Sequence, residues 1–172
     1  MEFQINDTAI YPAHGVGTIT DIETMEFEGE ELTFYTIKIE DNGMIVKVPM
    51  QKAQAIGMRK LMNASDIDAI YDVLRDRDTP PDNQTWNRRY REYMNKIKTG
   101  DPLEVAGVVR DLALMKRTKN LSFGERKMYD QAHRLLVQEV ALAKQVDEDK
   151  ATSEIDGIFE ADAPKLDSPL ED

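Results

Sequence analysis

The sequence has no cysteine and no long apolar run. The lack of cysteine excludes disulfides and thiolate metal sites, and it makes the cytoplasm the expected location. No apolar run approaches the roughly 18 residues that a membrane-spanning helix needs. The first ten residues also lack the basic and apolar regions of a signal peptide. We therefore expect a cytoplasmic protein with no membrane partner.

Groups that could carry catalysis are also scarce. The two histidines, His14 and His133, lie in different predicted domains, and neither has ligand-like spacing to an acidic residue or to the other histidine. The chain has no G-x-x-x-x-G-K-[ST] phosphate loop, and no G-x-G-x-x-G motif follows a strand. No nucleophile and base can be paired from the pattern. We therefore predict no enzyme activity, no metal site and no cofactor.

Aromatic residues make up only 7% of the chain, and the net charge of −11 is spread unevenly. Residues 1–56 hold ten acidic and three basic residues, and residues 151–172 hold seven acidic and one basic residue. Between them, residues 81–134 hold seven acidic and twelve basic residues and include the only tryptophan, Trp86. The total charge argues against nucleic acid as a partner. The basic middle segment is the part of the chain that could meet phosphates.

The first fifty residues have the pattern of short strands. Runs rich in β-branched and aromatic residues occur at 8–11, 16–23, 32–39 and 44–49, with turn signals between them. Asp-Asn-Gly at 41–43 is a hairpin signal. Four or five strands in so short a segment predict a small, strongly bent antiparallel barrel.

After residue 60 the apolar period changes from two residues to 3.6, which predicts helices. Their expected starts are Ser65 with its partner Asp68, Thr85, Asp101 before Pro102, and a capping box of Ser122 and Glu125. The Pro-Pro run at 78–82 breaks the chain between the first two helices. The second helix ends before Gly100, and the fourth ends near Val146.

From Asp147 onward the composition is acidic, with Ala, Ser and Pro, which predicts a mostly disordered tail. A short helix at 155–159 is the one exception that the pattern allows. The expected fold class is α+β in two domains: a small Tudor-like or SH3-like β-barrel at 1–58, a compact all-α domain at 59–148, and the tail at 149–172.

The segment from Gln84 to Lys96 holds Trp86 and three arginines. On a helix, Tyr90, Tyr93, Met94 and Ile97 fall within about 80° of Trp86, so periodicity allows Trp86 to pack in a core. Arg88 and Arg89, however, stand in the first turn, where the helix dipole disfavours cations by roughly 0.3–1 kcal/mol each. Such a violation is typical of a binding site. The pattern therefore also allows a phosphate clamp beside an apolar wedge.

The fourth predicted helix repeats this pattern, because Arg126 and Lys127 stand in its first turn. If the two helix starts lie close together, they form one basic face. The alternative is that these bases only balance the acidic ends of the chain.

Three segments resemble CarD/CdnL proteins, which are bacterial regulators that bind RNA polymerase. They are DTAIYPAHGVGTI at 7–19, TWNRRYREYMNKIKTGD at 85–101 and VAGVVRDLALMKRTKNLSFGERKMYDQAHRLLVQEVALA at 105–143. The resemblance covers about residues 3–146. It implies a Tudor-like barrel that docks on the polymerase β subunit, followed by a compact helical domain.

The resemblance also implies roles for single residues. The family's tryptophan that matches Trp86 wedges into the minor groove at the upstream edge of the transcription bubble. In the family, a set of basic residues faces the DNA backbone. The matching residues of this chain are Arg88, Arg89, Arg91, Arg126 and Lys127. Lys47 matches a basic residue that contacts β. Met25 stands where some relatives have arginine, so we expect a weaker or rearranged β contact there.

Together these patterns predict a monomeric transcription regulator. Its expected partners are the RNA polymerase β subunit and promoter DNA, which it contacts without sequence specificity to stabilise the open promoter complex. Two alternatives stay open at this point. One is a protein adaptor in which Trp86 is core, and the other is a small-barrel factor that binds RNA.

Overall fold

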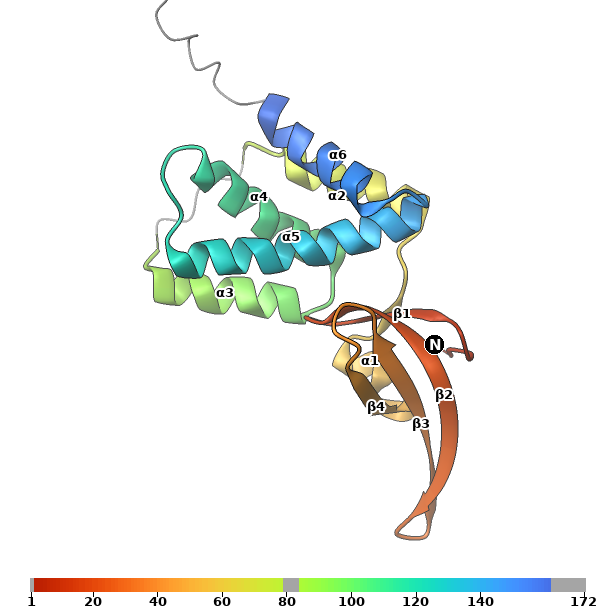
Figure 1. Ribbon diagram of the computed structural model, residues 1–172. Helices are drawn as coiled ribbons and strands as arrows, with labels where there is room; N and C mark the ends of the chain where they lie inside the picture. Colours follow the sequence, from red (N-terminus) through yellow and green to blue (C-terminus); the bar gives the residue numbers. More distant parts are fainter. Residues whose placement is uncertain (1, 79–83, 162–172) are drawn as a thin grey trace, which may run out of the picture.

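The computed structural model describes residues 2–78 and 84–161 and shows an antiparallel sheet followed by a helical domain (Figure 1). The sheet part contains β1 (Thr8–Tyr11), β2 (Gly15–Phe27), β3 (Glu30–Ile39), β4 (Ile45–Pro49), the 3-10 helix η1 (Met50–Lys52), α1 (Ala53–Ile56) and β5 (Arg59–Lys60). The helical part contains α2 (Ala64–Arg75), α3 (Trp86–Lys98), α4 (Pro102–Lys116), α5 (Phe123–Lys144) and α6 (Glu148–Ala161). The predicted α+β class, with a β part before an α part, is confirmed.

Successive residues of a strand point to opposite faces, and the apolar residues on one face of the sheet form its core. Tyr35, Ile37 and Ile39 of β3 are fully buried, and Val48 of β4 packs with them. The Phe3 N–H donates to the Tyr35 hydroxyl at 3.2 Å, which satisfies the polar end of a buried ring. The sheet part therefore has a core of its own.

The strand order is β4-β3-β2-β1-β5, and all neighbouring pairs are antiparallel. Over the described ranges, β4 and β5 do not pair with each other, so the sheet is open, whereas we predicted a barrel. The long β2–β3 hairpin curves and extends away from the helices (Figure 1). A register shift between Ile19 and Asp21 lies on this hairpin, and such shifts bend a strand.

The helix starts agree with the capping signals at three of four places. Asp101 accepts from the Leu103 N–H at 2.9 Å before α4, Ser122 and Glu125 form the predicted capping box before α5, and α3 follows Thr85. The fourth prediction is wrong, because α2 is capped by Asn63 with Asp66 and not by Ser65 with Asp68. Asparagine is as good an N-cap as serine, and both reciprocal hydrogen bonds form two residues earlier than predicted.

The predicted disorder after residue 147 is wrong for residues 148–161, which form α6. Ala151 and Ile155 are fully buried and Phe159 is 7% exposed. These residues are four apart, so they lie on one face of the helix and join the helical core. Residues 162–172 lie outside the described residues, as does most of the predicted break at 78–82.

The long helix α5 runs through the helical domain, with α3 below it and α4 and α6 above it in the view of Figure 1. Its apolar residues Met128, Ala132, Leu136 and Val140 are buried in one core with residues of the other helices. Leu135 is only half-buried and lies at the side that meets the sheet.

Candidate functional site

The amino ends of α3 and α5 lie side by side (Figure 1). Trp86, the first residue of α3, rests on Gly124 of α5, where a Cβ would meet the indole at 3.1–3.3 Å. A side chain at position 124 would therefore displace the indole. The structure thus brings together the two basic helix starts that the sequence pattern indicated. We call the region formed by residues 86–91 of α3 and 123–127 of α5 the basic end.

Arg89 differs from the expectation that it faces DNA, because it is buried. Its guanidinium donates to the Glu125 carboxylate at 3.2 Å through both terminal nitrogens, and its Nε donates to the Gln84 carbonyl at 3.2 Å. The unfavourable cation in the first turn of α3 is thus neutralised by an acid from another helix. Arg89 ties the two helix starts together beneath the surface.

Glu125 is the acid at the centre of this arrangement and is itself buried. It accepts from the Ser122 N–H at 2.9 Å and lies 3.4 Å from the Lys119 ammonium. Burial raises the pKa of Glu125, yet hydrogen bonds from Ser122 and Lys119 outweigh it, so this pKa lies below its ordinary value. The carboxylate stays charged at neutral pH, and its charge is turned inward.

Trp86 is half-buried and lies at the edge of the helical core. The Arg89 guanidinium lies 5.3 Å from its ring centre, a distance typical of a cation–π contact. Tyr90 meets the indole edge-on at 5.8 Å and is itself 46% exposed. The indole is therefore held on two sides and still reaches the surface. This placement is intermediate between a core residue and a fully exposed wedge.

Four of the predicted DNA-facing residues are exposed at the basic end: Arg88, Arg91, Arg126 and Lys127. None of them forms an ion pair with a residue in the described ranges. Lys116 and Lys119 add to this charge, because they line a hollow of about 160 Å³ together with Arg126. Solvent-exposed cations without acidic partners can meet phosphates at little cost in lost ion pairs.

Lys47 and Met25 lie on the same outer face of the sheet. Lys47 of β4 forms an ion pair with Glu23 of β2 at 3.5 Å, and Met25 is two residues further along β2. Their side chains are well exposed. The same face carries Ile45 and Phe27, which are 65% and 62% exposed.

The sequence interpretation missed the exposed apolar residues. Ile45 and Phe27 could have been found from alternation, since they are two residues from Lys47 and Met25. Phe123, which is 85% exposed at the first position of α5, carries no periodic signal because it stands where the helix begins.

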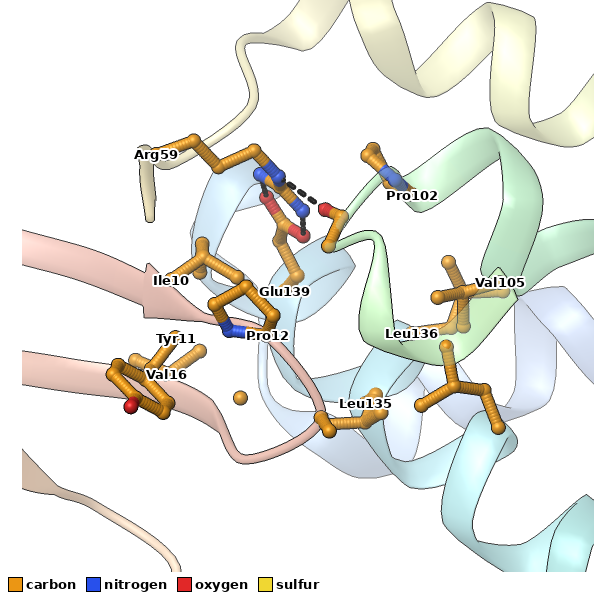
Figure 2. Close-up of a pocket in the computed structure, with 14 residues that line it drawn as sticks. Ile10, Tyr11, Pro12, Val16, Arg59, Pro102, Val105, Leu135, Leu136 and Glu139 are labelled. Carbon is orange, nitrogen blue, oxygen red and sulfur yellow. Dashed lines mark hydrogen bonds and ion pairs between the residues drawn. The ribbon is translucent and has the colours of Figure 1, made fainter. Parts of the chain in front are cut away.

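The two domains meet at a small cavity of about 30 Å³ between β1, the start of α4 and α5 (Figure 2). Arg59 of β5 forms a paired hydrogen bond with the Glu139 carboxylate of α5, at 2.5 and 2.6 Å, and donates to the Gly100 carbonyl at 2.6 Å. Glu139 also accepts from the Met62 N–H at 3.0 Å. These contacts link the sheet to the helices.

Two features are missing from the part of the chain that the structure describes. No helix there has the length and apolar character needed to span a membrane. No group of three or more histidine, aspartate or glutamate side chains there could hold a metal ion.

Two family models match the chain in order along the sequence. The CarD-like/TRCF RID domain matches residues 3–62, and the CarD C-terminal domain matches residues 69–156. Both matches include the regions described above: the first contains the sheet with Lys47, and the second contains the basic end.

Individual proteins are similar to the chain as well. The Bacillus subtilis (strain 168) protein named "Putative transcription factor YdeB" is 36% identical over 155 residues, which span 88% of this chain and 98% of that protein. The solution structure of the 72-residue N-terminal domain of Myxococcus xanthus CarD is 39% identical, with a TM-score of 0.30, over 34% of this chain and 79% of its own. CdnLNt from the same organism is 35% identical, with a TM-score of 0.31, over 36% of this chain and 87% of its own.

Proposed function

The chain belongs to the CarD-like family of transcription factors, and from this premise we propose how it acts. It docks on the RNA polymerase β subunit through its sheet domain and contacts promoter DNA at the upstream edge of the transcription bubble. That contact stabilises the open promoter complex. The protein acts as a monomer in the bacterial cytoplasm, and it performs no catalysis.

The observation that carries this proposal is the meeting of Trp86 with Gly124 at the basic end. It puts a half-buried indole among exposed cations from two helices. An apolar side chain of this kind can enter between base steps while arginine and lysine side chains contact the flanking phosphates. The buried pair of Arg89 and Glu125 holds the indole in place from below.

The charge distribution explains why two contacts are needed. A basic end on a chain of net charge −11 should bind free DNA no more tightly than the ~10⁻⁴–10⁻⁶ M that is usual for non-specific binding. Docking on polymerase makes the DNA contact intramolecular, at an effective concentration on the order of millimolar. A weak DNA contact is then sufficient.

The wedge also gives the protein a preference for melted DNA. Unstacking a paired step costs a few kcal/mol, whereas at the bubble edge the stack is already disrupted. Trp86 should therefore bind the open state better than the closed one. A difference of about 1.4 kcal/mol changes the ratio of open to closed complexes tenfold.

The test is the half-life of open promoter complexes after a competitor is added, with bacterial RNA polymerase. The wild-type protein should lengthen the half-life, and Trp86→Ala should not, although both bind polymerase equally. Arg88→Ala should shorten the half-life partially and lower the salt dependence by about one phosphate contact. If wild type and Trp86→Ala both bind polymerase and neither changes the half-life, the DNA contact is wrong and the protein is an adaptor.

The polymerase side is tested separately by binding to polymerase without DNA. Lys47→Glu should weaken this binding, because it reverses an exposed charge on the outer face of the sheet. Lys52→Glu is the matched control, since Lys52 is also exposed but lies in η1 after the strand. Equal affinities of wild type and Lys47→Glu would rule out this face as the docking surface.

A further inference from the structure

We infer, on the premise of the proposed function, that Phe123 is a second apolar contact to the DNA and stacks on an unpaired base beside Trp86. Phe123 is 85% exposed, the largest fraction for any large apolar side chain in the described ranges. It belongs to the basic end, because its neighbour Gly124 is the residue on which Trp86 rests.

The first turn of α5 places Phe123 between two cations. At about 100° per residue, Arg126 lies about 60° to one side of Phe123 and Lys127 about 40° to the other. Glu125 lies on the opposite side of the helix and is buried. The exposed face of this turn is therefore an aromatic ring flanked by positive charges, with the acid of the turn itself buried. The next acid on this face is Asp130, which lies about two turns further along α5 and lines the hollow with Arg126.

The backbone that carries Phe123 is held firmly. The Ser122 N–H donates to Glu125 at 2.9 Å, and the Glu125 N–H donates to the Ser122 hydroxyl at 3.2 Å, which closes the turn around position 123. A contact from a fixed turn loses little conformational entropy on binding. The backbone that presents the exposed ring is thus fixed and is not part of a free loop.

This chemistry fits a nucleic acid strand with unpaired bases. Aromatic rings stack on base faces whatever the sequence, and flanking arginine and lysine side chains follow the phosphates. Bases inside a duplex cover each other's faces, whereas a base at the bubble edge leaves a face open. Trp86 with Tyr90 on α3 and Phe123 on α5 would then contact the DNA at two points of the same basic end.

The experiment compares open-complex half-lives for the full-length wild type, Trp86→Ala, Phe123→Ala and Phe123→Trp. Leu142→Ala is the matched control, since Leu142 is an exposed apolar residue at the other end of α5. Phe123→Ala should reduce the protein-dependent lengthening of the half-life by roughly fivefold, the lower end of what one stacked base contributes. Phe123→Trp should retain the lengthening, and Leu142→Ala should match wild type.

A second measurement identifies the partner. With p-benzoylphenylalanine at position 123, ultraviolet light should crosslink the protein to promoter DNA in the open complex.

If Trp86→Ala shortens the half-life relative to wild type and Phe123→Ala does not, this inference is overturned while the proposed function stands. Crosslinking to a polymerase subunit, with weaker polymerase binding by Phe123→Ala, would overturn it in favour of a protein contact. If the wild type has no effect on the half-life, both fail.

Discussion

At the scale of residues, the pair of Arg89 and Glu125 determines how the basic end is built. Both side chains are buried, and they join α3 to α5 at 3.2 Å. Breaking a buried pair is costly because the remaining charge is left without its partner in a poorly solvated place. The pair therefore supports the surface that carries Trp86 without itself being part of that surface.

The pKa of Glu125 makes this support depend on pH. A carboxylate whose pKa is lowered by folding stabilises the protein above its unfolded pKa, and this contribution is lost as the pH falls through the folded pKa. We predict that Glu125→Gln lowers the free energy of unfolding by about 1.5–3 kcal/mol near neutral pH. The difference from wild type should shrink as the wild-type carboxyl becomes protonated.

Urea unfolding measures the difference in the free energy of unfolding between wild type and Glu125→Gln. It is done at about pH 7 and about pH 3.5, on either side of the ordinary carboxyl pKa. Glu92→Gln is the control, because Glu92 is exposed on α3 and its neutralisation should change stability little at either pH. A constant gap between wild type and Glu125→Gln at both values would mean that the charge of Glu125 contributes nothing to folding.

The burial of Arg89 could have been predicted from the sequence, whereas the identity of its partner, Glu125, could not. Arg89 lies about 60° from Trp86 on a helical projection, inside the apolar stripe of α3, so periodicity already placed it on the inward side. Arg89 also shares with Arg88 the first turn of α3, where the helix dipole disfavours cations, and for that reason we expected both to face DNA. Glu125 is 36 residues away along the chain, and no local pattern connects the two.

At the scale of elements, α6 shows where composition misleads. The acidic, Ala- and Ser-containing segment after residue 147 satisfied the pattern of a disordered tail. Ala151, Ile155 and Phe159 nevertheless recur every four residues, which is the spacing of a buried helix face. The charged residues lie on the remaining surface of α6, where Glu154 pairs with Lys144. A net charge does not prevent folding when the apolar face has a core to join.

We predict that Ile155→Ala lowers the free energy of unfolding by about 2–5 kcal/mol, because it leaves a cavity in the core. Ser153→Ala, at an exposed position of the same helix, should be nearly neutral or slightly stabilising. Urea unfolding followed by far-ultraviolet circular dichroism gives both values. Equal stabilities of Ile155→Ala and wild type would show that α6 is not part of the folded core.

The strands and most helix caps were predictable because their signals are local. Alternation marks a strand and a capping box marks a helix start, and both are complete within a few residues. Whether the sheet closes depends on whether β4 meets β5, which is a pairing between strands distant in the sequence. That is why the bent sheet was predicted correctly and its closure was not.

At the scale of the whole molecule, the joint between the domains fixes where the sheet domain lies relative to the basic end. Arg59 and Glu139 meet across 80 residues of chain, and the fork of the guanidinium matches both carboxylate oxygens (Figure 2). Arg134 of α5 adds a second link to Asp41, in the loop after β3. The gain in effective concentration is lost if the geometry forbids both proposed contacts at the same time, and these two links set that geometry.

We predict that Arg59→Ala uncouples the two domains. Glu139 is 4% exposed, and the loss of its partner leaves a buried carboxylate, which costs about 3–5 kcal/mol. Arg59→Lys should not restore the link, because an ammonium cannot match two oxygens and the Gly100 carbonyl at once. Lys60→Ala, at the exposed neighbouring position on β5, is the control and should behave as wild type.

The single tryptophan makes this measurable, since Trp86 fluorescence reports the helical domain alone while far-ultraviolet circular dichroism reports both domains. In the wild type the two urea transitions should coincide, as they do when domains unfold together. In Arg59→Ala they should separate, and the lengthening of the open-complex half-life should fall although polymerase binding is kept. Coincident transitions and an unchanged half-life in Arg59→Ala would mean that apolar contacts around Pro12 and Leu135 hold the joint without the ion pair.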